Sequence, residues 1–498
     1  MSQTSFTKPI TGVPPVNLEN VQGDIIYGLT KTHEHFLFFK IVEPDIFKEN
    51  LSSLKFTTSH DVMKTREAIL ELKAKSPGER LQLQLLNVSF SQQGLNALGI
   101  TEDLNDEAFK KGQFEDALEL GDPLAPGDPK KPNWKPAYCE HIDGVFQAAG
   151  DTYERTNKVL ENTLERLKGS IKEVYRLNGN TRPGDQRVSV AVQNITKHEH
   201  FGWQALDYQD EGARRNLQSS PQGSPLPAKR PYRARRSVIL LGQIGDTVPD
   251  PKNPKNPRVP VWRPKWAFEG SIMVFRELQQ LVPELDYFLE KTPFPVPLPP
   301  GQGKAILGSR LMGRWKNGVP VQLSPTSDDP KYLALDKINN FDYPQEPGFE
   351  GEASCPYSAH IRKMRPRNDI PEDQQEATRI NRKGITYGPE VQPDEQSEHT
   401  TMYERGLAFV CYQSNMKNGF RRLQIDWANN PKFLFKTKHV IAGYDPIIGQ
   451  TNEIVMPATG EENIKPPSNW VVPRGGGYFF TPSIKALKSV FSGKAYPE

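Results

Sequence analysis

The hydrophobic and polar positions along the chain follow two periodicities, one typical of strands and one typical of helices. Apolar residues run almost unbroken over Phe36–Val42, Ser271–Arg276 and Leu407–Tyr412, with many aromatic and β-branched side chains among them. Such runs predict buried strands. Around Asp61–Leu72 and Asp151–Leu167 the apolar residues recur every three or four positions, a spacing that predicts helices.

The second half of the chain repeats this style. A helix is expected over Glu277–Leu289, directly after the strand Ser271–Arg276, and another near Gly419–Trp427. Strand-then-helix units in both halves predict an α+β fold of two related sheets with helices outside. The 45 prolines favour long ordered loops over a helix bundle, because each proline fixes φ and removes a backbone donor.

The length of 498 residues allows two folding units. Prolines break up residues 1–15, which we interpret as a flexible arm. We expect an N-terminal domain over residues 16–240 and a C-terminal domain over residues 241–498.

Charge and composition exclude several classes of function. The 63 basic and 60 acidic side chains nearly cancel, which argues against a nucleic-acid-binding protein. No run of about 20 apolar residues predicts a membrane-spanning helix, and the N-terminus lacks the apolar stretch of a signal peptide. Cys139, Cys355 and Cys411 are too few for a disulfide framework and do not form a thiolate zinc motif. The sequence does not predict a cellular location.

Among the nine histidines, His360 has the most informative surroundings. It lies in Cys355–Arg367 among small residues and is followed by four cationic side chains. A haem needs an axial imidazole and cations for its two propionates, so the composition fits a haem-ligand segment. From these residues alone, a partly buried histidine beside a solvated basic turn is the favoured interpretation. Lys197–His200 holds two more histidines, without a third ligand nearby.

The Cys355–Arg367 segment resembles the haem-ligand segment of fungal dye-decolorising peroxidases, and the resemblance extends over most of the chain. Seven further segments are similar to landmarks of that family and occur in the same order: Asn20–Ile26, Gly144–Asp151, Gly270–Arg276, Gly313–Gly318, Arg382–Glu390, Gly406–Asn415 and Asp445–Gln450.

The resemblance implies a pair of ferredoxin-like α+β domains that bind one haem b per chain between sheet and helices. His360 would bind the iron through Nε2. Asp445 would accept the other ring proton and give the imidazole anionic character, which favours cleavage of the peroxide O–O bond. The alternative for Asp445 is a turn residue before Pro446.

The resemblance also assigns residues around the haem. Arg382 would stabilise the peroxide anion and the departing oxygen. Leu407 and Phe409 would crowd the distal face. The remaining expected partners would neutralise the propionates: Arg276, Arg314 and Arg362.

At one position the chain departs from the family. The family has a catalytic aspartate in Gly-Phe-x-Asp-Gly, whereas this chain reads Gly202-Trp-Gln-Ala-Leu206. Asp207 follows directly and is the expected replacement for the proton-transferring carboxylate. Asp210 and His200 are more remote candidates.

The implied function is peroxidase activity that uses H2O2 to oxidise dyes, phenols and similar aromatic donors through high-valent iron and surface radicals. Tyr387 and Trp427 resemble the family's radical sites, and Trp427 is expected to be exposed beside Asp426. Because the distal motif is altered, two alternatives stay open: haem-dependent cleavage of aryl alkenes or carotenoids, and a non-catalytic haem carrier. We expect a monomer or a weak homodimer without nucleic-acid or membrane partners.

Overall fold

The computed structural model describes residues 6–7, 16–76, 78–182, 238–243, 245–248, 258–292, 302–333, 337–345, 353–434, 441–450, 456–457, 463–464 and 469–497. The expected arm lies outside these ranges apart from Phe6–Thr7, which form β1 and pair with β10 (Arg263–Pro264). Lys197–His200 and Gly202–Asp207 also lie outside the described residues.

One sheet of nine strands dominates the fold, and it closes on itself. Its order is β11-β17-β3-β6-β2-β7-β13-β14-β12, and β11 also pairs with β14, so eight strands form a barrel. The short strand β12 pairs with the same edge of β14 as β13 does, further along that strand. The bounds are β2 (His33–Ile41), β3 (Gln84–Phe90), β6 (Gly144–Gly150), β7 (Ile171–Asn180), β11 (Ser271–Gln280), β12 (Asn381–Arg382), β13 (Ile385–Tyr387), β14 (Gly406–Gln413) and β17 (Val471–Thr481).

Both halves of the chain contribute neighbouring strands to the barrel. The first half supplies β2, β3, β6 and β7, and the second half supplies the other five strands. The halves meet where Phe480 of β17 pairs with Phe90 of β3, and where Tyr387 of β13 pairs with Gly179 of β7. The predicted α+β class is confirmed. The domain boundary near residue 240 and the expected oligomeric state stay predictions.

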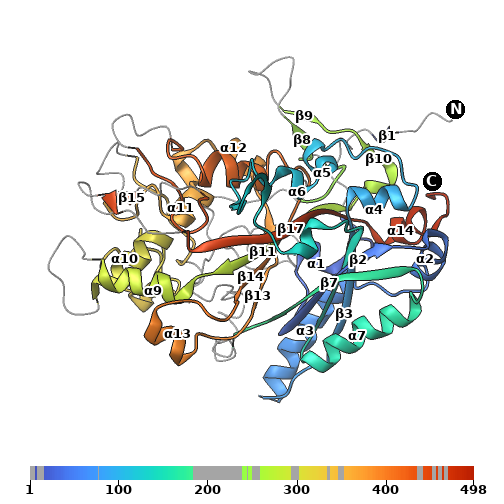
Figure 1. Ribbon diagram of the computed structural model, residues 1–498, viewed down its shortest axis with the longest axis horizontal. Helices are drawn as coiled ribbons and strands as arrows, with labels where there is room; N and C mark the ends of the chain where they lie inside the picture. The colour runs from blue at the N-terminus through green and yellow to red at the C-terminus, as the bar shows by residue number, and fades with distance from the viewer. Residues whose placement is uncertain are drawn as a thin grey trace, which may run out of the picture.

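Helices cover the outside of the barrel (Figure 1). The helix α7 packs on β2, β3 and β6, as the amphipathic spacing predicted. Within the described part of the chain, no helix is both long and apolar enough to cross a membrane. The principal helices, α7 included, are α1 (Gly23–Ile26), α2 (Pro44–Leu51), α3 (Ser59–Lys75), α4 (Gln92–Ala97), α7 (Tyr153–Arg166), α9 (Val282–Lys291), α10 (Gln302–Met312), α11 (His360–Met364), α12 (Glu372–Ala377), α13 (Pro393–Glu398), α14 (Ile484–Leu487) and the π-helix η8 (Arg422–Ala428).

The structure corrects one element of the second half. Residues 277–280 continue the strand β11 instead of beginning a helix, and α9 starts only at Val282. Because β11 pairs with β17 on one side and β14 on the other, its backbone groups are satisfied along its whole length. Tertiary pairing therefore overrides the local helical spacing.

Strand alternation divides the core into two layers. Phe36 and Phe38 of β2 point into the barrel, where each packs on Phe275 of β11 with ring centroids 5.0 and 4.9 Å apart. Leu37 and Phe39, the intervening side chains, belong to the outer core beneath the helices. The same alternation along β11 and β14 decides which of their side chains face outward.

Barrel closure between β11 and β14 predicts a sharp steric effect at Gly406. A Cβ atom at this position would lie 1.9 Å from the carbonyl oxygen of Leu278. Gly406→Ala should therefore lower the free energy of unfolding by about 2–3 kcal/mol, since the two strand backbones must move apart. The measurement is the urea midpoint followed by circular dichroism.

Gly127→Ala is the control for this substitution. Gly127 has φ +81° and no neighbouring atom within 4 Å, so only the left-handed backbone penalty of about 1 kcal/mol applies. Equal losses in the two variants would contradict the steric argument.

Candidate active site

A partly open cavity lies outside the barrel, between β11, β14 and β17 on one side and α11 and η8 on the other. Its empty space is about 940 Å³, a volume that includes open solvent. Its wall is mostly aliphatic and aromatic, with two arginines and one histidine among the polar members. The lining residues are Leu278, Ile361, Met364, Ile380, Leu407, Phe409, Phe420, Leu423, Ile447, Ile448, Val471, Pro473, Arg276, Gln280, His360, Arg382, Gln424 and Gln450.

His360 is held on the cavity wall by a buried carboxylate. Its Nδ1 lies 2.8 Å from Oδ2 of Asp445, which is fully buried. The other oxygen of Asp445 accepts the backbone N–H groups of Ile447 and Ile448 at 2.9 and 3.0 Å. A carboxylate at Nδ1 keeps the ring proton there, so Nε2 carries a lone pair suited to a metal.

Two separate elements bring this pair together. His360 is the first residue of α11, and Asp445 lies 85 residues later in a turn. The backbone N–H of Asp445 donates to Ala428 at 3.0 Å, at the end of η8, and Gly449 donates to the Asp445 carbonyl at 3.0 Å. These bonds fix the direction of the carboxylate before any ligand binds.

Arg276 and Arg382 both line the cavity, from β11 and β12. Nη2 of Arg276 lies 2.5 and 2.6 Å from the two carboxylate oxygens of Asp122, and Asp122 also accepts the indole N–H of Trp134 at 2.9 Å. Within the described residues, Nε of Arg276 is buried without a hydrogen-bond partner. One buried donor on the cavity wall therefore remains for an anionic group.

Arg314 and Arg362 do not line the cavity, and their expected role as propionate partners stays a prediction. Arg314 is fully buried and donates to the carbonyls of Gly318 and Ile338 at 2.9 and 3.0 Å. Arg362 forms an ion pair with Asp369 at 2.8 Å. Both guanidinium groups thus hold loop backbone and a carboxylate within the protein, a use that the basic sequence pattern did not distinguish from cofactor binding.

Leu407 and Phe409 line the cavity from β14, and their place over the distal face of a haem stays a prediction. Ala408 and Val410, which alternate with them, face the barrel interior instead. The two side chains narrow the cavity and make its wall apolar.

The two expected radical sites, Tyr387 and Trp427, are both buried. Trp427 is only 5% exposed and stacks on Phe433 with ring centroids 4.7 Å apart, so the expectation of an exposed indole is wrong. The π-helix turns this side chain toward the protein although Asp426 beside it is exposed. Tyr387 is 4% exposed, and burial together with Glu277 and Glu404 raises its pKa well above its ordinary value.

Sequence reasoning missed a polar cluster at the end of the barrel that holds Tyr387. Glu277 is fully buried there and accepts the hydroxyl groups of Tyr138 and Tyr175 at 2.9 and 3.1 Å. Lys135 forms ion pairs with both Glu277 and Glu404, the second at 2.8 Å. The only signal in the sequence was an acidic residue inside an apolar strand, directly after Arg276.

The expected distal carboxylate lies outside the described residues. This applies to Asp207 and also to His200 and Asp210. The alternative of alkene or carotenoid cleavage rests on the same Gly202–Leu206 segment, so it stays untested.

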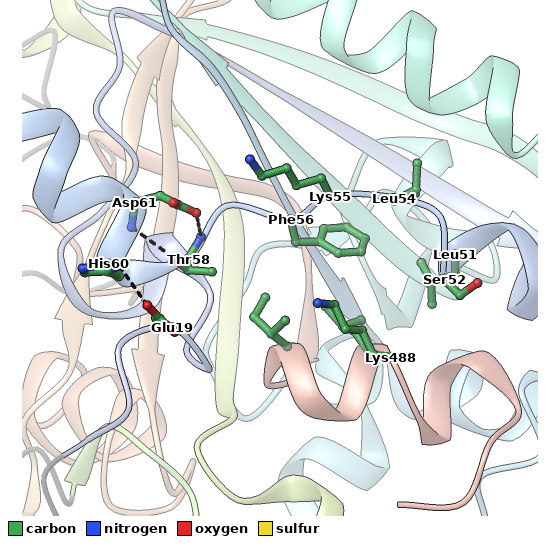
Figure 2. Close-up of a pocket in the computed structure, with 12 residues that line it drawn as sticks. Glu19, Leu51, Ser52, Leu54, Lys55, Phe56, Thr58, His60, Asp61 and Lys488 are labelled. Atoms are coloured by element: carbon green, nitrogen blue, oxygen red, sulfur yellow. Dashed lines mark hydrogen bonds and ion pairs between the residues drawn. The ribbon is translucent and has the colours of Figure 1, made fainter. Parts of the chain in front are cut away.

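A second hollow opens on the surface between the end of α2, the start of α3 and α14 (Figure 2). Its polar contacts serve the start of α3. Asp61 and Thr58 form a capping box, and His60 lies 3.4 Å from Glu19 (Figure 2). It shares no residue with the cavity at His360, and we assign its polar groups to helix capping.

Comparison with known proteins matches both halves of the chain to one family. Residues 20–183 match the DyP dimeric alpha+beta barrel domain, and residues 318–444 match the C-terminal region of Dyp-type peroxidases. The chain is 35% identical to a dye-decolorizing peroxidase of Mycena epipterygia, over 95% of this chain and 87% of that protein.

Solved structures are similar over nearly the whole chain. A variant of the dye-decolorizing peroxidase from Pleurotus ostreatus superimposes with a TM-score of 0.82 at 38% identity, covering 96% of this chain and all of that one. A dye-decolorizing peroxidase in complex with 2,6-dimethoxyphenol gives a TM-score of 0.75 at 34% identity, with coverage of 96% and 100%.

The pairing of Arg276 with Asp122 generates a stability prediction. Asp122→Ala should lower the free energy of unfolding by about 3–5 kcal/mol, because it leaves a buried guanidinium without its carboxylate. The double variant Asp122→Ala, Arg276→Met should recover much of this loss, since it removes both charges. Urea unfolding of the two variants and the wild type measures the difference, and a double variant no more stable than Asp122→Ala would contradict the pairing argument.

Proposed function

Since the chain belongs to the dye-decolorising peroxidase family, we propose that it is a haem peroxidase that uses H2O2 to oxidise dyes, phenols and related aromatic donors. The observation that carries this proposal is the His360–Asp445 pair on the wall of a large apolar cavity. When bound there, haem supplies an iron that reacts with peroxide and then accepts electrons singly from donors.

The residues present fit a haem b. The apolar wall suits the faces of a macrocycle, and the unpartnered buried Nε of Arg276 suits a propionate. No cysteine among the described residues lines the cavity, which agrees with a haem held without thioether bonds. We assign His360 as the axial ligand and Arg276 as a propionate partner.

On the proximal side, Asp445 holds the proton at Nδ1 of His360 and makes the imidazole a stronger donor to the metal. The two backbone N–H groups of Ile447 and Ile448 donate to Asp445 and hold its carboxylate in this orientation. A strongly donating ligand favours heterolytic cleavage of bound peroxide.

On the peroxide side, Arg382 contributes a fixed positive charge to the cavity. A guanidinium remains protonated at all physiological pH values, so it stabilises the peroxide anion and the oxygen that departs. Leu407 and Phe409 limit the ligands that reach this space. We propose Asp207 as the carboxylate that moves the proton between the peroxide oxygens.

Bulky dyes require a different contact from peroxide, because Leu407 and Phe409 narrow the cavity. We propose that Tyr387 and Trp427 relay electrons from such donors to the haem. Both aromatic groups are almost fully buried, so they act as inner stations of electron transfer and not as the point of contact.

The test of the proposed function is His360→Ala. The variant should lose the absorbance of histidine-ligated haem and at least about 100-fold of its peroxide-dependent dye oxidation. His60→Ala, a partly exposed histidine of the second hollow, is the control and should match the wild type. Unchanged haem absorbance in His360→Ala would exclude the axial assignment.

The Asp445 role predicts a separate effect. Asp445→Asn should retain bound haem but lose about 10–100-fold of its peroxide reactivity, because an amide does not give the imidazole anionic character. The rate of the haem absorbance change after peroxide addition measures this step directly. A rate equal to the wild type would limit Asp445 to a structural role.

A further inference from the structure

The proposed function leaves open where a bulky donor touches the protein, since Tyr387 and Trp427 are 4% and 5% exposed. Exposed aromatic groups close to them in the chain are therefore candidates for this contact. Tyr403 is 46% exposed and directly precedes Glu404, which accepts the hydroxyl of Tyr387 at 3.4 Å. It is thus one residue away from the polar cluster that surrounds Tyr387.

Tyr403 has its own proton acceptor at the surface. Its hydroxyl donates to Oδ2 of Asp394 at 3.1 Å, and this contact raises the pKa of Tyr403. The backbone N–H of Tyr403 donates to Glu395 at 3.0 Å, so the residue is anchored to α13. An exposed phenol with an anchored backbone and a carboxylate beside its hydroxyl is suited to losing an electron and a proton together.

Other exposed rings continue the surface around Tyr403. Tyr287 of α9 stacks on His399 with ring centroids 4.1 Å apart, and Thr401 ties the loop after α13 to Glu284 of α9. Tyr287 is 40% exposed and Met402 51% exposed, and α9 and α13 lie side by side in Figure 1. We call four exposed side chains of α9 and of the segment at the end of α13 the aromatic strip: Tyr287, His399, Met402 and Tyr403.

The charges around the aromatic strip favour a cationic donor. Asp394 and Glu398 of α13 are exposed, and no lysine or arginine among the described residues forms an ion pair with either. Lys291 lies over the ring of Tyr287 at 5.5 Å, but Glu290 lies 3.6 Å from its amine. Aromatic rings beside carboxylates that no described lysine or arginine neutralises form an arrangement that attracts a planar cation.

Strand pairing connects Tyr387 with the cavity wall. Tyr387 of β13 lies opposite Gly406 of β14, and Leu407, the next residue, lines the cavity. Glu277 of the same polar cluster directly follows Arg276, which also lines the cavity. Paired strands lie about 5 Å apart, so the backbone of Tyr387 lies one strand spacing from β14, whose Leu407 lines the cavity.

Burial keeps the inner tyrosines protonated. Burial and Glu277 raise the pKa of Tyr138 well above its ordinary value and that of Tyr175 to about 12. A buried phenol that loses an electron must also pass on its proton, because a cationic phenol radical is a strong acid without solvent. Each of these hydroxyl groups already has a carboxylate partner, Glu277 or Glu404.

From these contacts we infer that the aromatic strip is a surface oxidation site for bulky cationic aromatic donors, and that Tyr403 passes their electrons to Tyr387. The inference rests on the proposed function, because the peroxide-oxidised haem supplies the oxidant. Tyr387 gives one electron to that centre while its O–H bond breaks and Glu404 takes the proton. Tyr403 then reduces Tyr387, which regains its proton from Glu404, and the proton of Tyr403 moves to Asp394. The donor gives one electron to Tyr403, which recovers its proton from Asp394, and the donor leaves as a one-electron-oxidised radical.

The kinetic test compares Tyr403→Phe with Tyr153→Phe in the haem-loaded enzyme. Tyr153 is also 46% exposed but lies on α7, away from the aromatic strip. With a cationic triarylmethane dye, Tyr403→Phe should lose about tenfold in kcat/KM, while Tyr153→Phe keeps the wild-type value. The peroxide-induced change in haem absorbance should be the same in all three proteins.

These measurements distinguish a failure of the proposed function from a failure of the inference about the aromatic strip. A wild-type haem that does not respond to peroxide would overturn the proposed function itself. A normal peroxide response with full dye oxidation by Tyr403→Phe would overturn only the inference about the aromatic strip.

A second readout does not depend on dye turnover. Peroxide is added without a donor in the presence of a nitroso radical trap, and labelled peptides are identified by mass spectrometry. We expect the label on Tyr403, a clear loss of that label in Tyr387→Phe, and no label on Tyr153. Equal labelling of Tyr403 and Tyr153, or an unlabelled Tyr403, would contradict the route.

The third readout tests the donor's charge in the resting enzyme without peroxide. The combined substitution Asp394→Asn, Glu398→Gln should weaken binding of the cationic dye about fivefold at low salt, since two surface charges are removed. A fluorescence titration measures this binding. In the same titration, binding of an anionic azo dye should not weaken. Equal effects on both dyes would exclude selection by charge.

Discussion

Both the cavity and the buried tyrosine cluster depend on the strand β11. It pairs with β17 on one edge and with β14 on the other, and this second pairing closes the barrel. Because successive side chains of a strand point to opposite faces, Arg276 faces the cavity and Glu277 faces the barrel interior. One strand thus presents a cation to the cofactor site and a carboxylate to the tyrosines, and a shift of register by one residue would exchange the two.

Such charges are stable inside the protein only because each has a nearby counter-charge. Asp122 neutralises Arg276, and Lys135 neutralises Glu277. Burial raises the pKa of Glu277, while this carboxylate in turn raises the pKa of Lys135. Removing one member of either pair leaves an uncompensated charge at low dielectric, so these contacts constrain the sequence more strongly than the surrounding apolar packing does.

The sequence was sufficient to predict that His360 and Asp445 meet, but not all their neighbours. His360 and Asp445 meet as the resemblance implied, although they lie 85 residues apart. The same basic segment suggested that Arg362 contacts a propionate, whereas it pairs with Asp369. A run of cations indicates that negative partners exist nearby, but it carries no information on whether those partners belong to a ligand or to the chain itself.

The error for Trp427 has a different physical origin. A carboxylate next to an indole suggested exposure, and Asp426 is in fact exposed. In a π-helix, however, neighbouring residues are rotated relative to the α-helical pattern, and Trp427 turns onto Phe433. Periodicity arguments assume a regular element, so they fail where the backbone departs from regularity, and such departures are common near functional sites.

The closed sheet separates the cavity from the buried tyrosines. The cavity lies outside the barrel, whereas the carboxylate-bonded tyrosines lie at the end of the barrel interior. The intervening strands keep the acidic side chains Glu277 and Glu404 away from the cavity lining. Electrons can cross this layer over short distances, but protons cannot, and each tyrosine therefore needs a carboxylate on its own side of the sheet.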